Sequence, residues 1–190
     1  MMTTLTTARL RLEPMDDAHV DGLNALNSDP EVMRYLSGKP ETRAETVAMV
    51  DRVKARWREQ GYSWWTAIER DTGAIVGAGA VQNLRREATL LPDLACPLEL
   101  GWRLRRDRWG RGLATELALA IGDFAFDTLG AMEVYAVCDP ANAASAGVMA
   151  RLGMTPEGVQ RWYGKDATTY RIEAAQWRVN VAVRRGTSAS

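Results

Sequence analysis

The feature that most constrains the fold of this 190-residue chain is a strand, a glycine turn and a helix in direct succession. The stretch P-L-E-L-G-W-R-L (97–104) has the pattern of a strand, and it leads into the turn R-D-R-W-G-R-G. Behind the turn, apolar residues recur at the steps of an amphipathic helix: Leu113, Leu117, Ile121 and Phe124. A further strand pattern follows at 132–138. This order predicts a strand–helix–strand crossover in the middle of the chain.

Further elements flank the crossover on both sides in the sequence. Strand patterns occur at 8–14, 63–69, 74–84, about 155–164 and 168–179. Helix patterns occur from Asp16 to about Asn27, from 29 for a short stretch, and over 41–60 and 139–153. The segment 85–95 is expected to be a loop or a lid. We therefore predict a mixed α+β fold in a single domain over 1–182, followed by a frayed tail at 183–190.

Composition excludes several classes of protein. Lys plus Arg and Asp plus Glu both number 24, so no global field attracts nucleic acid or a membrane surface. Cys96 and Cys138 lack the spacing of a metal site and cannot build a disulfide framework, which indicates a reduced, cytoplasmic protein. The single histidine, His19, is expected on the surface and rules against a metal site or a catalytic triad built on histidine. No metal is therefore expected, and no apolar run reaches the length of a membrane span.

The glycine turn before the helix has the chemistry of an anion-binding loop. A helix N-terminus presents unpaired N–H groups and partial positive charge, and Gly110 and Gly112 allow an anion to approach the main chain closely. Several arginines crowd the same turn, so a diphosphate is the expected ligand. The alternative is that the two glycines only form a tight turn. The nucleotide-triphosphatase loop is absent, and Thr115 stands where a dinucleotide fingerprint needs its third glycine.

Two segments carry a resemblance to a known family. The run L-E-L-G-W-R-L-R-R-D-R-W-G-R-G-L-A-T-E, with N-A-A-S-A-G-V-M-A-R-L-G-M some thirty residues later, resembles the GNAT acetyltransferase superfamily. It is most similar to the branch that includes the RimJ and RimL ribosomal-protein N-acetyltransferases. The resemblance implies a mixed central sheet of six to seven strands, flanked by about four helices, with the crossover binding acetyl-CoA.

The resemblance also implies which residues hold acetyl-CoA. In the family a Q/R-x-x-G-x-G/A loop binds the pyrophosphate, and the first position of that pattern is Asp107 here, a departure that leaves the main-chain cradle intact. The strand through Leu104 should pair with the pantetheine arm. The residues expected to contact the co-substrate are Leu104, Arg106, Trp109, Gly110, Arg111, Gly112, Leu113, Ala114, Thr115, Asn142 and Ser145.

Glu99 is the candidate general base. An alkylamine has a pKa of ~10 and must lose a proton before it attacks a thioester. Glu99 lies among apolar residues on the strand that leads into the loop, where desolvation would raise its pKa, and alternation places it on one strand face with Gly101 and Arg103. An ion pair with an arginine or a solvated strand charge is the alternative role. Many members of the family deprotonate the amine through water.

Ser145 is the candidate group for the leaving thiolate. In the wider family a tyrosine acid stands seven residues after the asparagine of the second helix, and counting from Asn142 gives Met149, which cannot donate a proton. The RimL-like branch has a serine three residues after the asparagine, and Ser145 occupies that place. Asn142 would then bind the CoA arm. The alternatives are a helix cap at Asn142 and a small packing residue at Ser145.

The resulting hypothesis is an acetyl-CoA-dependent N-acetyltransferase whose acceptor is a primary amine, on a protein N-terminus or a small molecule. A non-catalytic acyl-CoA-binding module is the alternative, because of Met149. A dinucleotide-dependent oxidoreductase is a weaker one. No nucleic acid or membrane partner is expected, and a homodimer is left open.

Overall fold

A computed structural model describes residues 2–187 and divides into two compact units. The first unit runs to Gln82 and also includes Leu100–Ile121. The second comprises Asn83–Glu99 and the chain from Gly122 onward. Strand β5 (Leu98–Leu104) and helix α4 (Leu113–Asp123) therefore begin in one unit and end in the other.

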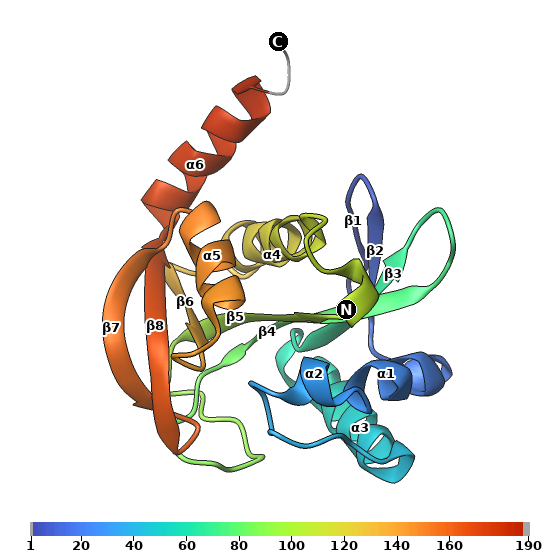
Figure 1. Ribbon diagram of the computed structural model, residues 1–190. Helices are drawn as coiled ribbons and strands as arrows, with labels where there is room; N and C mark the ends of the chain where they lie inside the picture. The colour runs from blue at the N-terminus through green and yellow to red at the C-terminus, as the bar shows by residue number, and fades with distance from the viewer. Residues whose placement is uncertain (1, 188–190) are drawn as a thin grey trace. The chain divides into compact units, whose positions relative to one another are not determined.

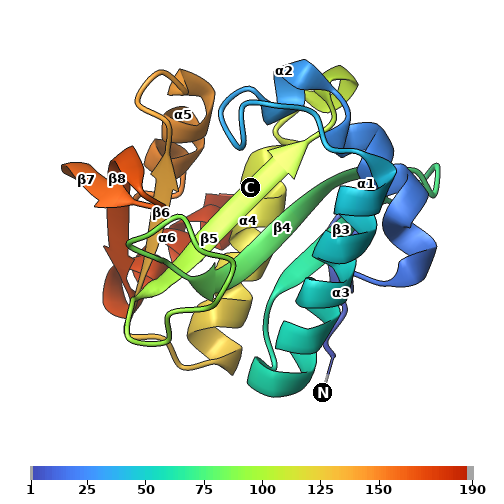
Figure 2. The ribbon, with the colours of Figure 1, turned by 90° about the horizontal axis from the view of Figure 1, so that it is seen from below.

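The first unit is an antiparallel meander with helices on both faces. Strand β1 (Leu5–Thr6) pairs with β2 (Leu10–Pro14), β2 with β3 (Trp64–Glu69), and β3 with β4 (Ile75–Asn83), all antiparallel. Helices α1 (Val20–Asn27), α2 (Pro30–Met33) and α3 (Arg43–Gln60) lie together on one face of these strands (Figures 1 and 2). Helix α4 lies on the other face, where a Cβ at Gly79 would come within 2.5 Å of Leu117 Cδ2.

The second unit is built on β6 (Glu133–Cys138), β7 (Thr155–Trp162) and β8 (Lys165–Glu173). Strand β8 pairs antiparallel with both β6 and β7, and Glu99 of β5 pairs with Tyr135 of β6 in parallel. Helix α5 (Ala143–Arg151) joins β6 to β7, and α6 (Ala174–Thr187) continues from the end of β8 (Figure 1). A π-helical turn, Phe124–Thr128, follows α4.

The predicted class, a mixed α+β fold, is confirmed, with eight strands and six α-helices among residues 2–187. The short β1 was not predicted. The second closing strand was predicted to run to 179, but β8 ends at Glu173 and Trp177 lies in α6 instead. The alternation of R-V-N-V-A-V resembles a strand, yet Trp177 and Asn180 face the protein at a helical three-residue spacing, with Asn180 Nδ2 donating to Leu152 O. The single domain stays a prediction.

The predicted frayed tail falls partly on α6, which extends to Thr187. Residues 188–190 of that prediction lie outside the described residues. Among the residues that are described, no helix is long and apolar enough to cross a membrane.

His19 is buried, so the expectation of a surface position was wrong. Its ring accepts from Asp16 N at 3.2 Å and hydrogen-bonds Thr66 Oγ1 at 3.1 Å. The ring therefore closes the 3-10 turn Asp17–His19 that precedes α1, because Asp16 is the N-cap of that turn and His19 completes its capping box. The histidine is a structural residue.

Helix α6 depends on one glycine in α4. The Trp177 ring is almost wholly buried and donates from Nε1 to Asp123 Oδ1 at 2.9 Å. A Cβ at Gly122 would lie 2.3 Å from Trp177 Cη2, which is closer than atoms can approach. The indole therefore packs directly against the backbone of α4.

We expect Gly122→Ala to lower the free energy of unfolding by about 1–3 kcal/mol, because the methyl group overpacks the contact with Trp177. Gly147→Ala is the matched control, since a Cβ there meets only the flexible end of Arg151 at 3.4 Å. In that helix interior alanine is favoured, so the control should be neutral or stabilised by up to ~1 kcal/mol. Urea unfolding of both variants measures the difference, and equal midpoints would contradict the packing assignment.

Candidate functional site

The glycine turn and the start of α4 form a loop whose main-chain N–H groups precede the hydrogen-bond ladder of the helix. Gly110 and Gly112 have φ of 72° and 74°, a left-handed conformation that only glycine adopts without strain. The hydrogen bond from Glu116 N to Gly112 O, 3.1 Å, opens the helical ladder, and the N–H groups before it have no partner within a helix. No atom lies within 4 Å of a Cβ position at Gly110, so there is room for a ligand at the loop.

Arg9 braces this loop from the start of β2. Its Nη1 donates to Arg111 O at 2.8 Å, and its Nε pairs with Glu116 Oε2 at 2.6 Å. Thr7 Oγ1 also donates to Glu116 Oε1 at 2.6 Å. Burial raises the pKa of Glu116, but the hydrogen bonds from Thr7 and Arg9 outweigh it and hold that pKa below its usual value. The carboxylate is therefore a fixed anchor that joins the first turn of α4 to the N-terminal strands.

Two of the loop arginines are engaged in ion pairs. Arg105 contacts Asp107 through Nε and Nη2 at 3.2 and 2.9 Å. Arg108 contacts Asp107 at 2.7 Å and Glu69 at 3.3 and 3.2 Å. Asp107, the departure from the family pattern, thus binds two neighbouring guanidinium groups. The exposed side chains of Arg106 and Arg111 have no ion-pair partner among residues 2–187, which leaves them for a ligand.

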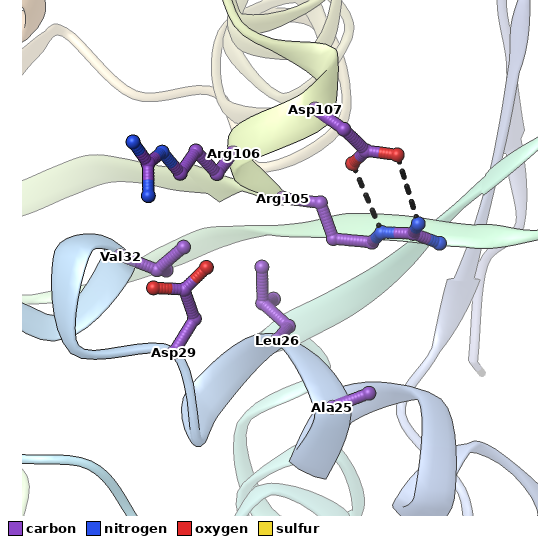
Figure 3. Close-up of a pocket in the computed structure, with 7 residues that line it drawn as sticks. All are labelled: Ala25, Leu26, Asp29, Val32, Arg105, Arg106 and Asp107. Carbon is purple, nitrogen blue, oxygen red and sulfur yellow. Dashed lines mark hydrogen bonds and ion pairs between the residues drawn. The ribbon is translucent and has the colours of Figure 1, made fainter.

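A cavity of about 530 Å³ adjoins the start of the loop. Figure 3 shows Arg105 paired with Asp107 on one side, while Arg106 extends separately toward the α1–α2 segment. The cavity is lined by Ala25, Leu26, Asp29, Val32, Arg105, Arg106 and Asp107. Its lining contains both apolar and charged side chains. Of the two arginines in the lining, Arg106 has no ion-pair partner within residues 2–187.

A hydrogen bond joins the end of β5, the strand that precedes the loop, to the side chain of Trp109. Trp109 is 47% exposed, and its Nε1 donates to Leu104 O at 2.9 Å. Leu104 itself is buried. One acceptor position of the Leu104 carbonyl is therefore used within the protein.

Glu99, in the second unit, is buried, and the hydroxyl of Tyr163 donates to its Oε2. The tyrosine ring also lies below Arg85, whose Cζ is 5.0 Å from the ring centroid. A buried carboxylate that is hydrogen-bonded to a phenolic hydroxyl has a fixed orientation. The hydroxyl can stay bonded to the carboxyl group in either protonation state, because it can both donate and accept.

Tyr163 has an unusual backbone. It is the one non-glycine residue with positive φ among the described residues, at 54°. With Gly164, φ 73°, it forms the two-residue turn between β7 and β8, in which Trp162 pairs with Lys165. Such turns favour Asn-Gly, and a bulky residue in this conformation costs roughly 1–2 kcal/mol. The hydrogen bonds Tyr163 N→Arg85 O (2.7 Å) and Gly164 N→Arg86 O (2.9 Å) hold the turn in place. Strain retained at a turn is typical of functional positions.

Helix α5 carries the other candidates. Asn142 is its N-cap and accepts from Ser145 N at 3.2 Å, so the capping role is observed. Ser145 is half-buried, and no hydrogen bond of its hydroxyl is found within residues 2–187. Met149 is almost wholly buried and belongs to the core, which excludes it from contact with a ligand at the surface. The hydroxyl of Ser145 is the donor that the helix offers.

The two cysteine thiols are not activated. Burial raises the pKa of both thiols, Cys96 and Cys138, and both cysteines are free. Residues 2–187 contain no group of three His, Cys, Asp or Glu side chains suited to a metal ion.

Each unit thus holds part of the predicted set. The loop residues from Leu104 to Thr115 lie in the first unit, and Glu99, Asn142 and Ser145 lie in the second. Sequence reasoning missed Arg9 and Tyr163. Nothing local marks Arg9, whereas the tyrosine before a glycine at 163–164, at the end of the strand pattern predicted over about 155–164, was a detectable signal of an atypical hairpin turn.

Comparisons with known proteins identify the family and the fold of this chain. Residues 9–155 match the family model described as an acetyltransferase (GNAT) domain. The chain is 33% identical to the uncharacterized protein YkkB of Bacillus subtilis, over 88% of this chain and 94% of that protein. It is 30% identical to an FsC-acetyl coenzyme A-N(2)-transacetylase of Aspergillus fumigatus, over 94% and 75% of the two chains. An acetyltransferase structure from Agrobacterium tumefaciens superimposes with a TM-score of 0.75 and 27% identity, covering 91% and 95%. RimL with coenzyme A bound, at 16% identity, shares the fold, with a TM-score of 0.72 over 90% and 98%.

We expect Gly110→Ala to weaken CoA binding at least tenfold, because a left-handed alanine is strained and its methyl group occupies the approach to the main chain. Gly73→Ala is the control: its φ is 69°, and no atom lies within 4 Å of its Cβ position either. Both variants should lose similar stability, about 1 kcal/mol. Calorimetric titration with CoA separates them, and equal affinities would remove the loop from the binding site.

Proposed function

This chain belongs to the GNAT acetyltransferase family, and we propose that it is an acetyl-CoA-dependent N-acetyltransferase that modifies a primary amine. The observation that carries the proposal is the left-handed Gly110–Gly112 backbone at the open N-terminus of α4. It offers a row of main-chain donors with nothing packed above Gly110.

The residues fit the co-substrate in charge and shape. The diphosphate would lie on the N–H groups of the loop and the first turn of α4, with Arg106 and Arg111 neutralising its charge. We assign Leu104 and Trp109 to the pantetheine arm, and the resemblance to the family assigns Asn142 to the CoA arm and Ser145 to the thiolate. When bound, acetyl-CoA supplies the activated acetyl group.

The chemistry needs a base for the ammonium and a donor for the sulfur. We assign the base to Glu99, directly or through one water, with Tyr163 orienting the carboxylate. Glu99 takes one proton from the ammonium, and the neutral amine then attacks the acetyl carbon. As the carbon–nitrogen bond forms and the carbon–sulfur bond breaks, the nitrogen loses its second proton, which balances the proton that the sulfur takes up. The Ser145 hydroxyl donates to the departing sulfur, which leaves as the thiol after protonation.

The acceptor is a protein N-terminus or a small-molecule amine. We also propose that the chain belongs to the RimJ/RimL branch, on the basis of Asn142 and Ser145 of α5. The likeness to the RimL structure supports the fold alone. Neutral net charge supports a protein with no nucleic acid or membrane partner, acting in the cytoplasm. A homodimer stays open.

A non-catalytic acyl-CoA-binding module is the second candidate, favoured by the buried Met149 at the position where the family resemblance implies a tyrosine acid. Release of free thiol from acetyl-CoA with a panel of amines, with mass spectrometry of the products, separates the two. Amine-dependent thiol release with an acetylated product supports the enzyme. CoA binding without turnover on any amine supports the module.

Glu99→Gln should depress kcat/KM most at neutral and moderately acidic pH, where free amine is scarce, and leave acetyl-CoA affinity unchanged. Raising the pH toward the pKa of the amine, ~10, should partly rescue the variant, because solvent then supplies the deprotonated acceptor. The measurement is a pH–rate profile, with melting temperatures alongside.

Tyr163→Phe should give a smaller loss with the same pH dependence, since it removes only the hydroxyl that holds the carboxylate. Tyr170→Phe, on β8 in the same unit, is the control and should match wild type. Profiles parallel to wild type for Glu99→Gln would exclude the carboxylate as the base, and a large fall in its melting temperature would assign it a structural role.

A further inference from the structure

Arg103 of β5 has hydrogen-bond donors that the protein leaves unused. Its guanidinium carbon lies 4.7 Å from the centroid of the Trp64 ring, in a cation–π contact. Its Nε and Nη2 are shielded from water and have no partner among residues 2–187. Burial lowers the pKa of Arg103 to about 10, against the opposing effect of the Glu41 carboxylate, so the group is still a cation at neutral pH. Buried donors without acceptors are unfavourable, and a bound anion would remove that cost.

The strand surface beside Arg103 is left bare by Gly101. A Cβ at Gly101 would meet only Ala80 Cβ and Trp64 Cη2, both at 3.8 Å, an ordinary contact. The glycines of β4 differ, because a Cβ at Gly77 or Gly79 would come within 2.5 Å of protein atoms. Packing thus explains the glycines of β4 and does not explain Gly101. A strand glycine is typical of a bulge, a tight bend or a place where a ligand or another backbone approaches closely, and the open surface here favours a ligand.

Arg103 faces away from the diphosphate loop. A Cβ at Gly77 would touch Leu104 Cδ2, and one at Gly79 would touch α4, so the Leu104 side chain shares the face that α4 covers. Side chains alternate along a strand, and Arg103 therefore points to the opposite face, where Trp64 lies. An anion bound there would belong to the acceptor rather than to the diphosphate of CoA.

The chemistry around Arg103 favours one kind of anion. The negative charge of Glu41, which accepts from the buried Asn27 Nδ2 at 2.8 Å, acts on Arg103, so a dianion such as a phosphate monoester would be repelled more strongly than the single charge of a carboxylate. The fork of a guanidinium matches a planar carboxylate through two parallel hydrogen bonds. A flat group also fits over an indole ring and a strand without a side chain.

We propose that Arg103, Trp64 and the bare surface at Gly101 bind a carboxylate of the acceptor, so that the enzyme acetylates amines that also carry a carboxylate. This inference rests on the proposed N-acetyltransferase function. Amino acids and peptides with an acidic group near the N-terminus belong to that class, whereas polyamines and aminated sugars do not.

The test is acetylation of matched pairs, each L-amino acid against its own carboxamide, by wild type and by Arg103→Gln, Arg103→Lys and Gly101→Ala. Wild type should prefer the acid of its best pair by about tenfold or more in kcat/KM, which is the effect of one charge-assisted contact. Arg103→Gln should remove that preference by raising KM for the acid alone, with CoA affinity unchanged. Gly101→Ala should fold normally and raise the same KM by filling the surface.

If Arg103→Gln does not fold, Arg103→Lys replaces it in the test. Lysine keeps the positive charge but lacks the paired donors of the guanidinium, so this variant should lose most of the preference for acids. Arg58→Gln, exposed on α3 of the same unit, is the control and should keep it. Equal use of acids and amides by wild type overturns the proposal, and so does an equal loss for both in Arg103→Gln. Weakened CoA binding in that variant would assign Arg103 to the co-substrate instead.

A parallel calorimetric titration of the same pairs into CoA-saturated protein measures the site without turnover. If wild type binds acids selectively and Arg103→Gln does not, the carboxylate site is supported. This holds even if no amine is acetylated, because the lack of acetylation would count only against the proposed N-acetyltransferase function. Equal binding of acids and amides in that titration overturns the inference.

Discussion

The left-handed backbone at Gly110 and Gly112 is the constraint on which the rest of the site depends. It turns the chain from the end of β5 into α4 so that successive N–H groups are left without intrahelical partners. Such a turn is intrinsically loose, and here Arg9 and Glu116 fix it by joining the loop carbonyl and the first helical turn to β2. The ion pairs of Asp107 fix the other end. A flexible sequence thus becomes a preorganised cradle.

In the second unit, a strained backbone conformation at Tyr163 orients a side chain of the proposed site. A tyrosine in a turn that favours Asn-Gly is locally unfavourable, and the surrounding hydrogen bonds from Tyr163 and Gly164 maintain it. The hydroxyl reaches Glu99, which is buried at the start of β5. A turn with asparagine would be more stable and would leave the carboxylate without this donor. The proposed base is therefore supported at the expense of local turn stability, in line with other strained functional positions.

Sequence reasoning predicted the parts of this structure that depend on local periodicity. The crossover around α4, the strand patterns that form β3 and β4, and the helix pattern over 41–60 that contains α3 all follow from residues close together in the chain. It failed where tertiary contacts decide. Trp177 lies in a helix because Gly122 and Asp123 receive its indole, and His19 is buried because Thr66 lies opposite it.

The same division applies to the site. The glycines and loop arginines could be predicted as a group, but only the structure shows that, within residues 2–187, Arg105 and Arg108 form ion pairs while Arg106 and Arg111 do not. Arg9 is separated from Glu116 by 107 residues, a distance in sequence over which no local pattern operates. Gly101 shows the limit most clearly, since a strand glycine gains meaning only when its neighbours in space are known.

The central claim is that the main chain from Gly110 to Thr115 binds a diphosphate. Hydrogen exchange of the backbone amides, measured with CoA and with pantetheine, tests it directly, because pantetheine lacks the diphosphate. The account predicts that CoA slows exchange of the amides of residues 110–115 and that pantetheine at saturation does not. Exchange in this segment that CoA leaves unchanged, or that both ligands slow equally, would contradict it.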